Sequence, residues 1–502
     1  MFFTRMRFWI TTTKRVSEKL LFLKFSRITL AMMFILLLIT SACTDSKVKR
    51  PNIILCMSDD QGWGDVGYHG HPYLKTPNID KMAESGIKLE RFYSGAPVCS
   101  PTRGSSLTGR HPFRYGIFNA NIGHMPKDEL TIAEILQTLD YATGHFGKWH
   151  LGTLTTTIAE SNRGGKQGSE HYSPPWENGF DECFSSEAAV PTYDPMIKPR
   201  GWKDQRWWNP VKEGEPSEKF NTHYWTGPEQ IVTENLEGDD SKLIMDRAIS
   251  FIKNAVKEDK PFFSVIWFHA PHRPVVAGKE YRNLYSELDQ YSQNYYGCIS
   301  AMDTQIGRLR KSLRELEIAD NTMLWFCSDN GPDGVADENA GKRHGKGTAG
   351  NLRGRKFDLF EGGVRVPGIL EWPDKIEPGQ VTEFPSSTSD YFSTIMDALN
   401  HTIANGPKPV DGISLLPILN GKMIERTSPI AFELNNQISL IGNRFKIISI
   451  DKGKTYMMFD IKNDPGEQNN IADEKPELLK KMKNELETWQ KSCNQSLAGK
   501  DY

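Results

Sequence analysis

Short apolar runs alternate with amphipathic stretches from residue 51 to about residue 400. The runs at 51–58 and 321–328 are rich in apolar residues, as strands covered on both faces are. Helical periodicity lies between such runs, most clearly at 76–86 and 295–318. Because helices and buried strands follow one another in this way, the pattern predicts an α/β fold with a mixed, mostly parallel sheet sandwiched by helices.

The pattern changes in two places. Between residues 153 and 237 it dissolves into Gly, Pro and Trp with little periodicity, which predicts an irregular but ordered excursion near the site. Its Trp202, Trp207 and Trp208 either stack on sugar rings or pack the segment onto the domain. From 411 to 502, short strand-like runs and a final helix predict a small α+β subdomain after a catalytic domain at 51–410.

The first 43 residues form a separate segment. A basic stretch precedes "ITLAMMFILLLITSAC", whose apolar run is shorter than the roughly 18 to 20 residues that a membrane-spanning helix needs. This is typical of an export signal. The ending in small residues and Cys43 resembles a bacterial lipoprotein signal, which predicts an exported chain in the periplasm or at the cell surface with a lipid on Cys43. Plain secretion and an uncleaved anchor are the alternatives.

Composition excludes some partners. Lys and Arg total 61 against 63 Asp and Glu, so no excess of positive charge is present to bind nucleic acid. Seven scattered cysteines without metal-binding spacing argue against a disulfide framework. Cys56 and Cys327 lie in strand-like runs and are interpreted as small buried hydrophobic residues. Cys99 lies in a polar segment instead.

Polar residues follow directly after predicted strands, among them Asp59 with Asp60 and Asp329 with Asn330. Open α/β sheets bind their ligands at the carboxyl ends of the strands, so we expect the functional site there. Hard oxygen ligands from two strands suit Ca²⁺ or Mg²⁺. One such pair is more often a helix cap or a surface turn, but two in matching context favour a metal.

Basic residues occupy similar positions. Lys148 and His150 in "GKWHLG" lie two positions apart, so in an extended segment both side chains point to the same side and can hold an anion and transfer a proton. His272 in "FHAPHRP" follows another strand-like run, and Lys356 lies beside the glycine-rich "FEGGVRVP". A lone histidine at such a boundary is usually structural.

Cys99 begins the stretch "CSPTRGSSLTGR". Arg103 falls in the first turn of the helix that this stretch predicts, so that helix amides and a guanidinium both face position 99. The segment therefore predicts an anion site.

These motifs together resemble the type I sulfatases. "CSPTRGSSLTGR" is similar to the family signature, and "PNIILCMSDDQGWGDVGYHG", "TPNIDKMAESG", "GKWHLG", "APH", "SDNG" and "EGGVRVP" follow in the family's order and spacing. The resemblance extends from Pro51 to Pro367, with a recognisable "FDIKNDPGEQNN" later. It is nearest to arylsulfatase A-like and N-acetylgalactosamine-6-sulfatase-like members. Ser106 departs from the family, which usually has an aliphatic residue there, and this affects helix packing rather than chemistry.

The resemblance implies an alkaline-phosphatase-like fold and a modified nucleophile. Cys99 would be oxidised after translation to Cα-formylglycine by a formylglycine-generating or equivalent maturation enzyme. One hydroxyl of the hydrated aldehyde would attack sulfur, with Asp329 as base. One divalent ion, in this family usually Ca²⁺ with Mg²⁺ as the alternative, would be bound by Asp59, Asp60, Cys99, Asp329 and Asn330.

The resemblance also assigns the basic residues. Lys148, Lys356 and Arg103 would offset charge on the sulfuryl oxygens, together with the metal ion. His272 would protonate the leaving alcohol, either alone or together with Lys356. His150 would take the proton from the remaining hydroxyl, so that sulfate leaves and the aldehyde is restored.

The resulting hypothesis is an exported sulfatase that removes sulfate from a carbohydrate. An alternative enzyme is a phosphate or phosphonate monoester hydrolase of the same superfamily. A non-enzyme alternative is a glycan-binding lipoprotein with an inactive site. The latter requires a missing catalytic residue, and none of the family's site residues is missing from the sequence.

Overall fold

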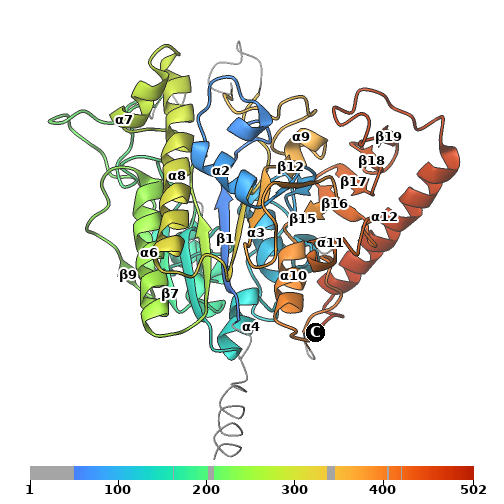
Figure 1. Cartoon of the computed structure of the whole chain (residues 1–502), viewed down its shortest axis with the longest axis horizontal. Helices are drawn as coiled ribbons and strands as arrows, with labels where there is room; N and C mark the ends of the chain where they lie inside the picture. The colour runs from blue at the N-terminus through green and yellow to red at the C-terminus, as the bar shows by residue number, and fades with distance from the viewer. Residues whose placement is uncertain (1–49, 162, 202–207, 336–344, 404–405, 420) are drawn as a thin grey trace, which may run out of the picture. The chain divides into compact units, whose positions relative to one another are not determined.

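The computed structural model describes residues 50–502, apart from 162, 202–207, 336–344, 404–405 and 420 (Figure 1). The predicted export signal, with Cys43, lies outside the described residues. Within the described residues, no helix is both long and apolar enough to cross a membrane.

The main sheet has ten strands in the part of the chain that the structure describes. In spatial order these are β14 (Gln380–Thr382), β2 (Ile87–Leu89), β13 (Gly368–Glu371), β11 (Thr322–Ser328), β1 (Asn52–Ser58), β10 (Phe262–Trp267), β4 (Ala142–Lys148), β7 (Glu182–Ser186), β8 (Tyr224–Gly227) and β9 (Gln230–Ile231). The central strands β11, β1, β10, β4 and β7 are parallel, and antiparallel pairs occur toward both edges. The predicted mixed, mostly parallel sheet is confirmed.

Helices cover both faces of this sheet. On one face lie α2 (Pro77–Ser85), α6 (Asp240–Lys257) and α8 (Gln290–Glu315), and on the other α3 (Cys99–Thr108), α4 (Ile132–Thr138) and α10 (Asp390–Ala398) (Figure 1). Strand β1 shows why its sequence is apolar throughout. Ile54 and Cys56 pack toward the first set of helices, and Ile53 and Leu55 toward the second, because successive side chains point to opposite faces.

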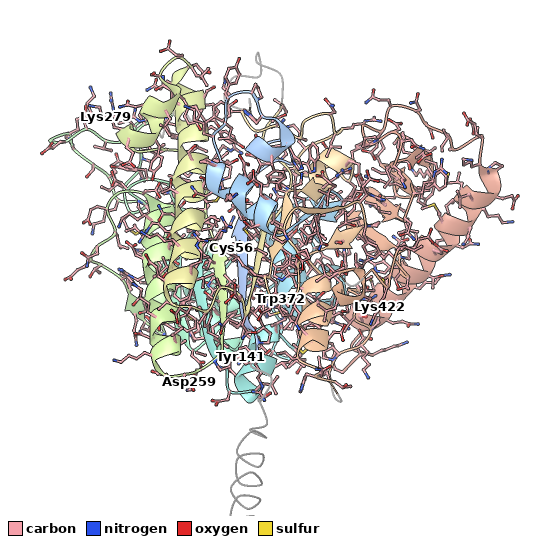
Figure 2. All side chains as sticks on the ribbon, viewed as in Figure 1. Cys56, Tyr141, Asp259, Lys279, Trp372 and Lys422 are labelled. Atoms are coloured by element: carbon pink, nitrogen blue, oxygen red, sulfur yellow. The ribbon has the colours of Figure 1, made fainter. Side chains whose placement is uncertain are left out.

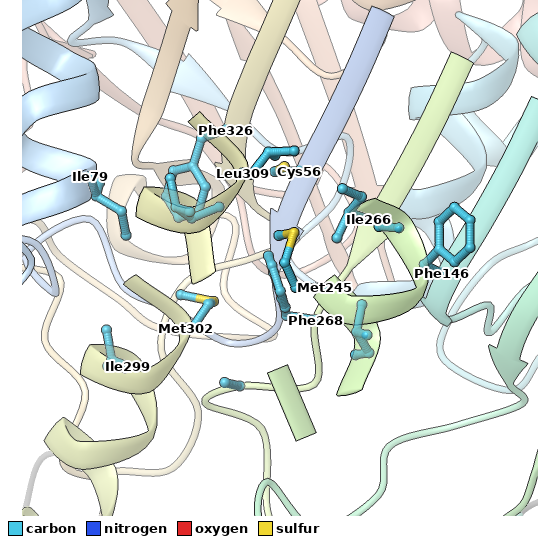
Figure 3. Packing of buried hydrophobic residues seen from close by; sticks show 14 of the residues in the cluster. Cys56, Ile79, Phe146, Met245, Ile266, Phe268, Ile299, Met302, Leu309 and Phe326 are labelled. Carbon is cyan, nitrogen blue, oxygen red and sulfur yellow. The ribbon is translucent and has the colours of Figure 1, made fainter. Parts of the chain in front are cut away.

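Figure 3 shows the packing on the first face, where Cys56 and Ile266 of the sheet meet Met245 of α6 and Met302 of α8. Cys56 is also labelled near the centre of Figure 2, with Lys279 at the upper left margin. Cys56 and Cys327 are both buried, as their apolar surroundings in the sequence predict. The close packing of both faces fixes the strands that carry the site at their ends.

Polar side chains define the ends of the helices. Thr131 and Glu134 form a capping box at the start of α4, and Asp239 caps α6. Asp303 of α8 accepts the backbone N–H groups of Asn78 and Ile79, and so caps α2 from a distant part of the chain. These caps satisfy amides that the helices themselves leave unpaired.

The segment 153–237 is more regular than its sequence indicates. It contributes β7, β8 and β9 to one edge of the main sheet, so the prediction of an irregular excursion is wrong for these strands. They are short, and β9 has only two residues, which is too few to produce a detectable alternation. Trp208 is buried and packs against Tyr291, as the packing alternative requires, while Trp202 and Trp207 lie outside the described residues.

The C-terminal part is a smaller antiparallel sheet with one long helix. The strands are β16 (Ile430–Leu434), β17 (Gln437–Ile441), β18 (Phe445–Ser449) and β19 (Met457–Asp460), and the helix is α12 (Pro476–Leu497). Met482 and Leu486 of α12 cover one face of this sheet. The other face packs on the segment around α9 (Glu361–Val364). The division of the chain at residue 411 stays a prediction, because Arg50–Tyr502 form one compact unit.

The remaining elements are short. They are β3 (Phe92–Tyr93), β5 (Ala159–Glu160), β6 (Arg163–Gly164), β12 (Arg365–Val366), β15 (Ser386–Ser387), α5 (Gly165–Gly168), α7 (Lys279–Arg282), α11 (Leu416–Leu419) and the 3₁₀ turns η1 (Gly67–His69), η2 (Pro112–Tyr115), η3 (Ser169–His171), η4 (Pro175–Glu177) and η5 (Asn283–Tyr285).

A buried charge cluster joins the C-terminal sheet to the glycine-rich "EGGVRVP" segment. The Lys446 ammonium lies 3.0 Å from Glu361 and 2.9 Å from Glu467, with no exposed side-chain surface on any of the three residues. Burial raises the pKa of Glu467 to about 7. Burial acts in the same direction on Glu361, but the Lys446 charge outweighs it and holds the pKa of Glu361 below its usual range.

We expect Lys446→Met to lower the free energy of unfolding by about 3 to 5 kcal/mol, because it leaves Glu467 buried without its cation. Glu361, by contrast, keeps Arg365 at 3.7 Å. Without the ammonium, the folded-state pKa of Glu467 lies still further above that of the unfolded chain. The stability of the variant is therefore highest below the unfolded pKa and falls as pH rises through the folded one. Urea unfolding at about pH 5 and about pH 8 measures this, and the exposed Lys422→Met is the control, expected within about 0.5 kcal/mol of wild type. Equal effects at both pH values would contradict the prediction.

Candidate active site

The polar clusters predicted at the strand ends meet at the carboxyl ends of two central strands of the sheet. Asp59 and Asp60 follow β1, and Asp329 and Asn330 follow its parallel neighbour β11. The backbone N–H of Asp329 donates to the Ser58 carbonyl, which keeps the two segments paired just past the strands. This pairing is why residues 270 positions apart lie together.

Hydrogen bonds join Asp60 to both Asp329 and Asn330. The Asp60 backbone N–H donates to Asp329 Oδ1 at 3.0 Å, and the Asn330 amide donates to Asp60 Oδ1 at 2.7 Å. Ligand atoms of Asp59, Cys99 and Asp329 lie within 4.8 Å of one another, and so do those of Asp59, Asp60 and His272. The structure therefore brings all five predicted metal ligands together.

The donor set fits a hard divalent cation. Asp59 Oδ1, Asp60 Oδ2 and Asn330 Oδ1 are buried and accept no hydrogen bond within the described residues. Buried side-chain oxygens are normally paired, so two carboxylate oxygens and one amide oxygen without hydrogen bonds in one cluster indicate a missing positive partner. Oxygen-only ligands suit Ca²⁺ or Mg²⁺ rather than a soft transition metal.

Cys99 is the first residue of α3, and its side chain is buried. The preceding turn is held by Thr102, whose hydroxyl donates to the Ala96 carbonyl and accepts from the Ala96 N–H. Burial raises the pKa of the Cys99 thiol, so an unmodified Cys99 is a poor nucleophile. The departing residue Ser106 donates its hydroxyl to the Arg103 carbonyl within the helix, so it affects only local packing.

Arg103 lies one turn further along α3 and has no exposed side-chain surface. Its guanidinium donates to Asp329 Oδ2 at 2.6 Å and to the Lys148 carbonyl at 3.0 Å, and lies 3.4 Å from Asp59. The guanidinium is thus committed to the metal-site carboxylates and to the end of β4.

Two lysines complete the charge balance. Lys148, the last residue of β4, lies 2.7 Å from Asp59 Oδ2, and Lys356 lies 2.5 Å from Asp60 Oδ1. Burial lowers the pKa of Lys356, but Asp60 and the neighbouring acidic groups outweigh it and raise that pKa above its usual value. Both ammonium groups are placed to face an anion next to Cys99.

The pKa values of Asp59 and Asp329 are shifted in opposite directions. Burial opposes the ionisation of Asp59, but Lys148, His272 and Arg103 together hold its pKa well below the usual range. Burial and the negative charge of Asp59 raise the pKa of Asp329 to about 7. Two adjacent carboxylates with separated pKa values are typical of catalytic sites.

The two predicted histidines differ in their contacts. His150 Nε2 lies 2.8 Å from Asn121 Oδ1, and its Nδ1 is buried without a hydrogen-bond partner among the described residues. His272 Nε2 lies 3.7 Å from Asp60 Oδ2, and its Nδ1 lies 2.7 Å from the Arg273 carbonyl. Burial lowers the pKa of His272 to about 4.

A cavity of about 510 Å³ connects these groups. Of the predicted residues, Cys99, Lys148, His150, His272 and Lys356 line it. Behind the cavity wall, Asp59 pairs with Lys148 and Asp60 pairs with Lys356. The buried Arg103 donates to the Lys148 carbonyl. A second, larger cavity of about 690 Å³ lies beside α12, where Trp489 and Arg114 are among its lining residues, and none of the predicted site residues lines it.

The sequence interpretation missed several residues of the 510 Å³ cavity. Asn121, Lys198, Arg273, Asp333 and Phe357 all line it, and Arg273 forms an ion pair with Asp333 at 2.7 Å. Arg273 could be found from its position next to His272 and Asp333 from its place after "SDNG". No pattern in the sequence points to Asn121, Lys198 or Phe357.

The fold and this site define the class of protein. The family model "Sulfatase" matches residues 51–401, and the model "N-sulphoglucosamine sulphohydrolase, C-terminal" matches residues 354–492. The chain belongs to the sulfatase family and is a sulfuric ester hydrolase.

Individual relatives agree. Human N-acetylgalactosamine-6-sulfatase is 32% identical over 393 residues, which are 75% of this chain and 67% of the relative. Human steryl-sulfatase is 29% identical over 455 residues, with 78% and 73% covered. The crystal structure of Ps i-CgsB in complex with k-i-k-neocarrahexaose matches with a TM-score of 0.74 and 26% identity, covering 89% of this chain and 94% of that one.

Proposed function

We propose that this chain removes sulfate from a sulfated carbohydrate, with Cα-formylglycine at position 99 and one Ca²⁺ ion beside it. One observation carries the proposal. Cys99 begins a helix at the wall of a cavity whose other lining residues include Lys148, His150, His272 and Lys356, directly above the cluster of unpaired oxygens.

The modified residue and the ion supply what the unmodified side chains lack. Asp59, Asp60, Asp329 and Asn330 would hold Ca²⁺ together with residue 99, and Ca²⁺ would supply Lewis-acid stabilisation of negative charge. The hydrated aldehyde supplies one hydroxyl that attacks sulfur and a second whose deprotonation releases sulfate. A serine would lack the second hydroxyl and would stop after one turnover.

The chain's own residues then bind and position the sulfate group. Lys148 and Lys356 would neutralise the sulfuryl oxygens, and because both side chains are buried and held by carboxylates, their charges are fixed in position before the substrate binds. Arg103 is not among the lining residues of the cavity, so its charge would offset the sulfuryl oxygens from behind Asp329, and we propose that it also positions Asp329 and the end of β4. Asp329 lies beside residue 99 and is held in place by Arg103, so it is positioned to accept the nucleophile's proton.

Protons leave and enter through the histidines and Lys356. Within the part of the chain that the structure describes, the buried Nδ1 of His150 makes no hydrogen bond, which suits the acceptance of a proton from residue 99. His272 is neutral near pH 7 in the free site because burial lowers its pKa to about 4. A bound sulfate ester adds negative charge and raises this pKa, so we propose that His272 is protonated on substrate binding and donates to the leaving alcohol, with Lys356 beside it.

The substrate class rests on three supports. The relatives include an N-acetylgalactosamine-6-sulfatase, a neighbouring structure was solved with k-i-k-neocarrahexaose, and the cavity combines cations with amide and hydroxyl groups. We further propose that residues 1–43 direct export and that Cys43 carries a lipid, which would place the enzyme where sulfated polysaccharides occur. Its partners are then the substrate and the maturation enzyme.

The test is expression with a formylglycine-generating enzyme followed by assay of sulfate release from defined sulfated sugars. We expect release from at least one sugar and much slower hydrolysis of the matching phosphate ester. Faster phosphate release would favour the phosphate or phosphonate ester alternative. Binding of sulfated glycan without any turnover by protein that carries formylglycine would favour the inactive-lipoprotein alternative.

A further inference from the structure

Phe357 is a large apolar residue that lines the catalytic cavity yet remains 44% exposed. It follows Lys356 directly, and the Lys356 ammonium lies 5.6 Å from the centre of its ring. Large apolar side chains usually lose their solvent contact on folding, so an exposed aromatic ring inside a binding pocket indicates a role in recognition.

The main-chain conformation at position 357 does not favour an aromatic residue. Its φ of 75° lies in the left-handed region, which bulky residues rarely adopt. Two hydrogen bonds hold it there: the Phe357 N–H donates to the Pro97 carbonyl at 2.8 Å, and the Gln437 amide donates to the Phe357 carbonyl at 2.7 Å. Glycine would adopt this conformation without strain, so the aromatic side chain is held at an unfavourable position by its surroundings.

Other residues of the cavity offer hydrogen bonds. Asn121, Ser161, Asn221 and Thr222 line the same cavity as Phe357. A pyranose ring presents weakly positive C–H groups on its faces and hydroxyl groups around its edge. The negative face of an aromatic ring attracts the former, and amides and hydroxyls pair with the latter.

We propose that Phe357 is the platform on which the sulfated sugar ring stacks, and that it sets the affinity of the enzyme for that sugar. This inference rests on the proposed function. The neighbouring Lys356 faces the sulfate group, so the position of the ring next to it places the sugar beside the reacting ester. Phe357 thus determines specificity and takes no part in proton transfer.

The test is steady-state kinetics with a sugar from which the wild-type enzyme releases sulfate. Phe357→Ala is expected to raise KM about five- to tenfold, as loss of one stacking contact predicts, with kcat within about twofold. Phe357→Tyr and Phe357→Trp restore KM to near the wild-type value. Inhibition by inorganic sulfate stays unchanged in all variants, because that ion has no sugar ring.

Two further variants separate binding from folding. Phe357→Gly removes the ring and relieves the left-handed main chain, so its melting temperature is expected to equal or exceed that of wild type while KM rises as in Phe357→Ala. Tyr73→Ala removes a ring that is 57% exposed and outside the cavity, and KM should not change.

Three outcomes would overturn the inference. An unchanged KM in Phe357→Ala and Phe357→Gly would overturn it alone, with the proposed function intact. Equal weakening of sugar and inorganic sulfate binding would also overturn it, since the ring would then support the anion site. A wild-type enzyme with formylglycine that releases no sulfate from any sugar would overturn the proposed function and this inference together.

Discussion

Cys99→Ala is expected to lower kcat for sulfate release by about 10⁴-fold or more, since loss of an enzyme's nucleophile has effects of this size. The fold should remain, because the turn before α3 is held by Thr102 and Ala96 rather than by the side chain of residue 99. Replacing that one small buried side chain by a methyl group is expected to lower the free energy of unfolding by only about 1 kcal/mol. Thermal unfolding and sulfate release, measured on the same preparation, test both statements.

Cys99→Ser is the matched control. Serine has one hydroxyl group that can attack sulfur, but it lacks the second hydroxyl of hydrated formylglycine. We therefore expect at most one sulfate transferred per enzyme molecule, which leaves a stable sulfated serine. Sustained turnover by Cys99→Ser would contradict the proposed chemistry. A loss of stability in Cys99→Ala as large as that of a core deletion would show that Cys99 is structural.

Removal of the divalent ion has the second largest expected effect. Dialysis against a chelator should abolish sulfate release, and added Ca²⁺ should restore it. Because the proposed Ca²⁺ ligands come together only in the folded chain, saturating Ca²⁺ should also stabilise the chelated protein, by about 2.7 kcal/mol at a hundredfold excess over Kd. Calorimetric titration and thermal unfolding follow binding without depending on activity.

Asp60→Asn tests which residues bind the ion. Asp60 Oδ2 is one of the unpaired buried oxygens, and replacing its charge by an amide should weaken Ca²⁺ binding about 100-fold. Asp333→Asn removes another carboxylate of the same cavity, which pairs with Arg273 instead, and should bind Ca²⁺ as wild type does. Equal Ca²⁺ affinity in both variants would contradict the assigned ligand set.

The strands that carry the site could be predicted because they are buried on both faces. Residues 52–58 and 322–328 contain enough apolar side chains to identify a strand, and the polar residues after them locate its end. The edge strands β8 and β9 could not be predicted, because they are short and alternate poorly. The pairing of Lys446 with Glu361 and Glu467 also escaped prediction, since the three residues lie far apart in sequence.

Residues of the candidate site could be predicted where one short motif contains both the functional side chain and the end of the strand or helix that positions it. Asp59, Cys99, Lys148 and Asp329 fall in this class, and the structure brings them together. The cavity rim is different. Phe357 is recognisable only from its exposure and its main-chain conformation, which depend on contacts with Pro97 and Gln437 from distant segments.

Mass spectrometry of the peptide that contains residue 99 tests the central claim most directly. The enzyme should be purified after expression with its maturation enzyme and shown to release sulfate before digestion. We expect an aldehyde at position 99, in a proportion that follows the specific activity of each preparation. Fully active enzyme in which residue 99 is an unmodified cysteine thiol would contradict the claim.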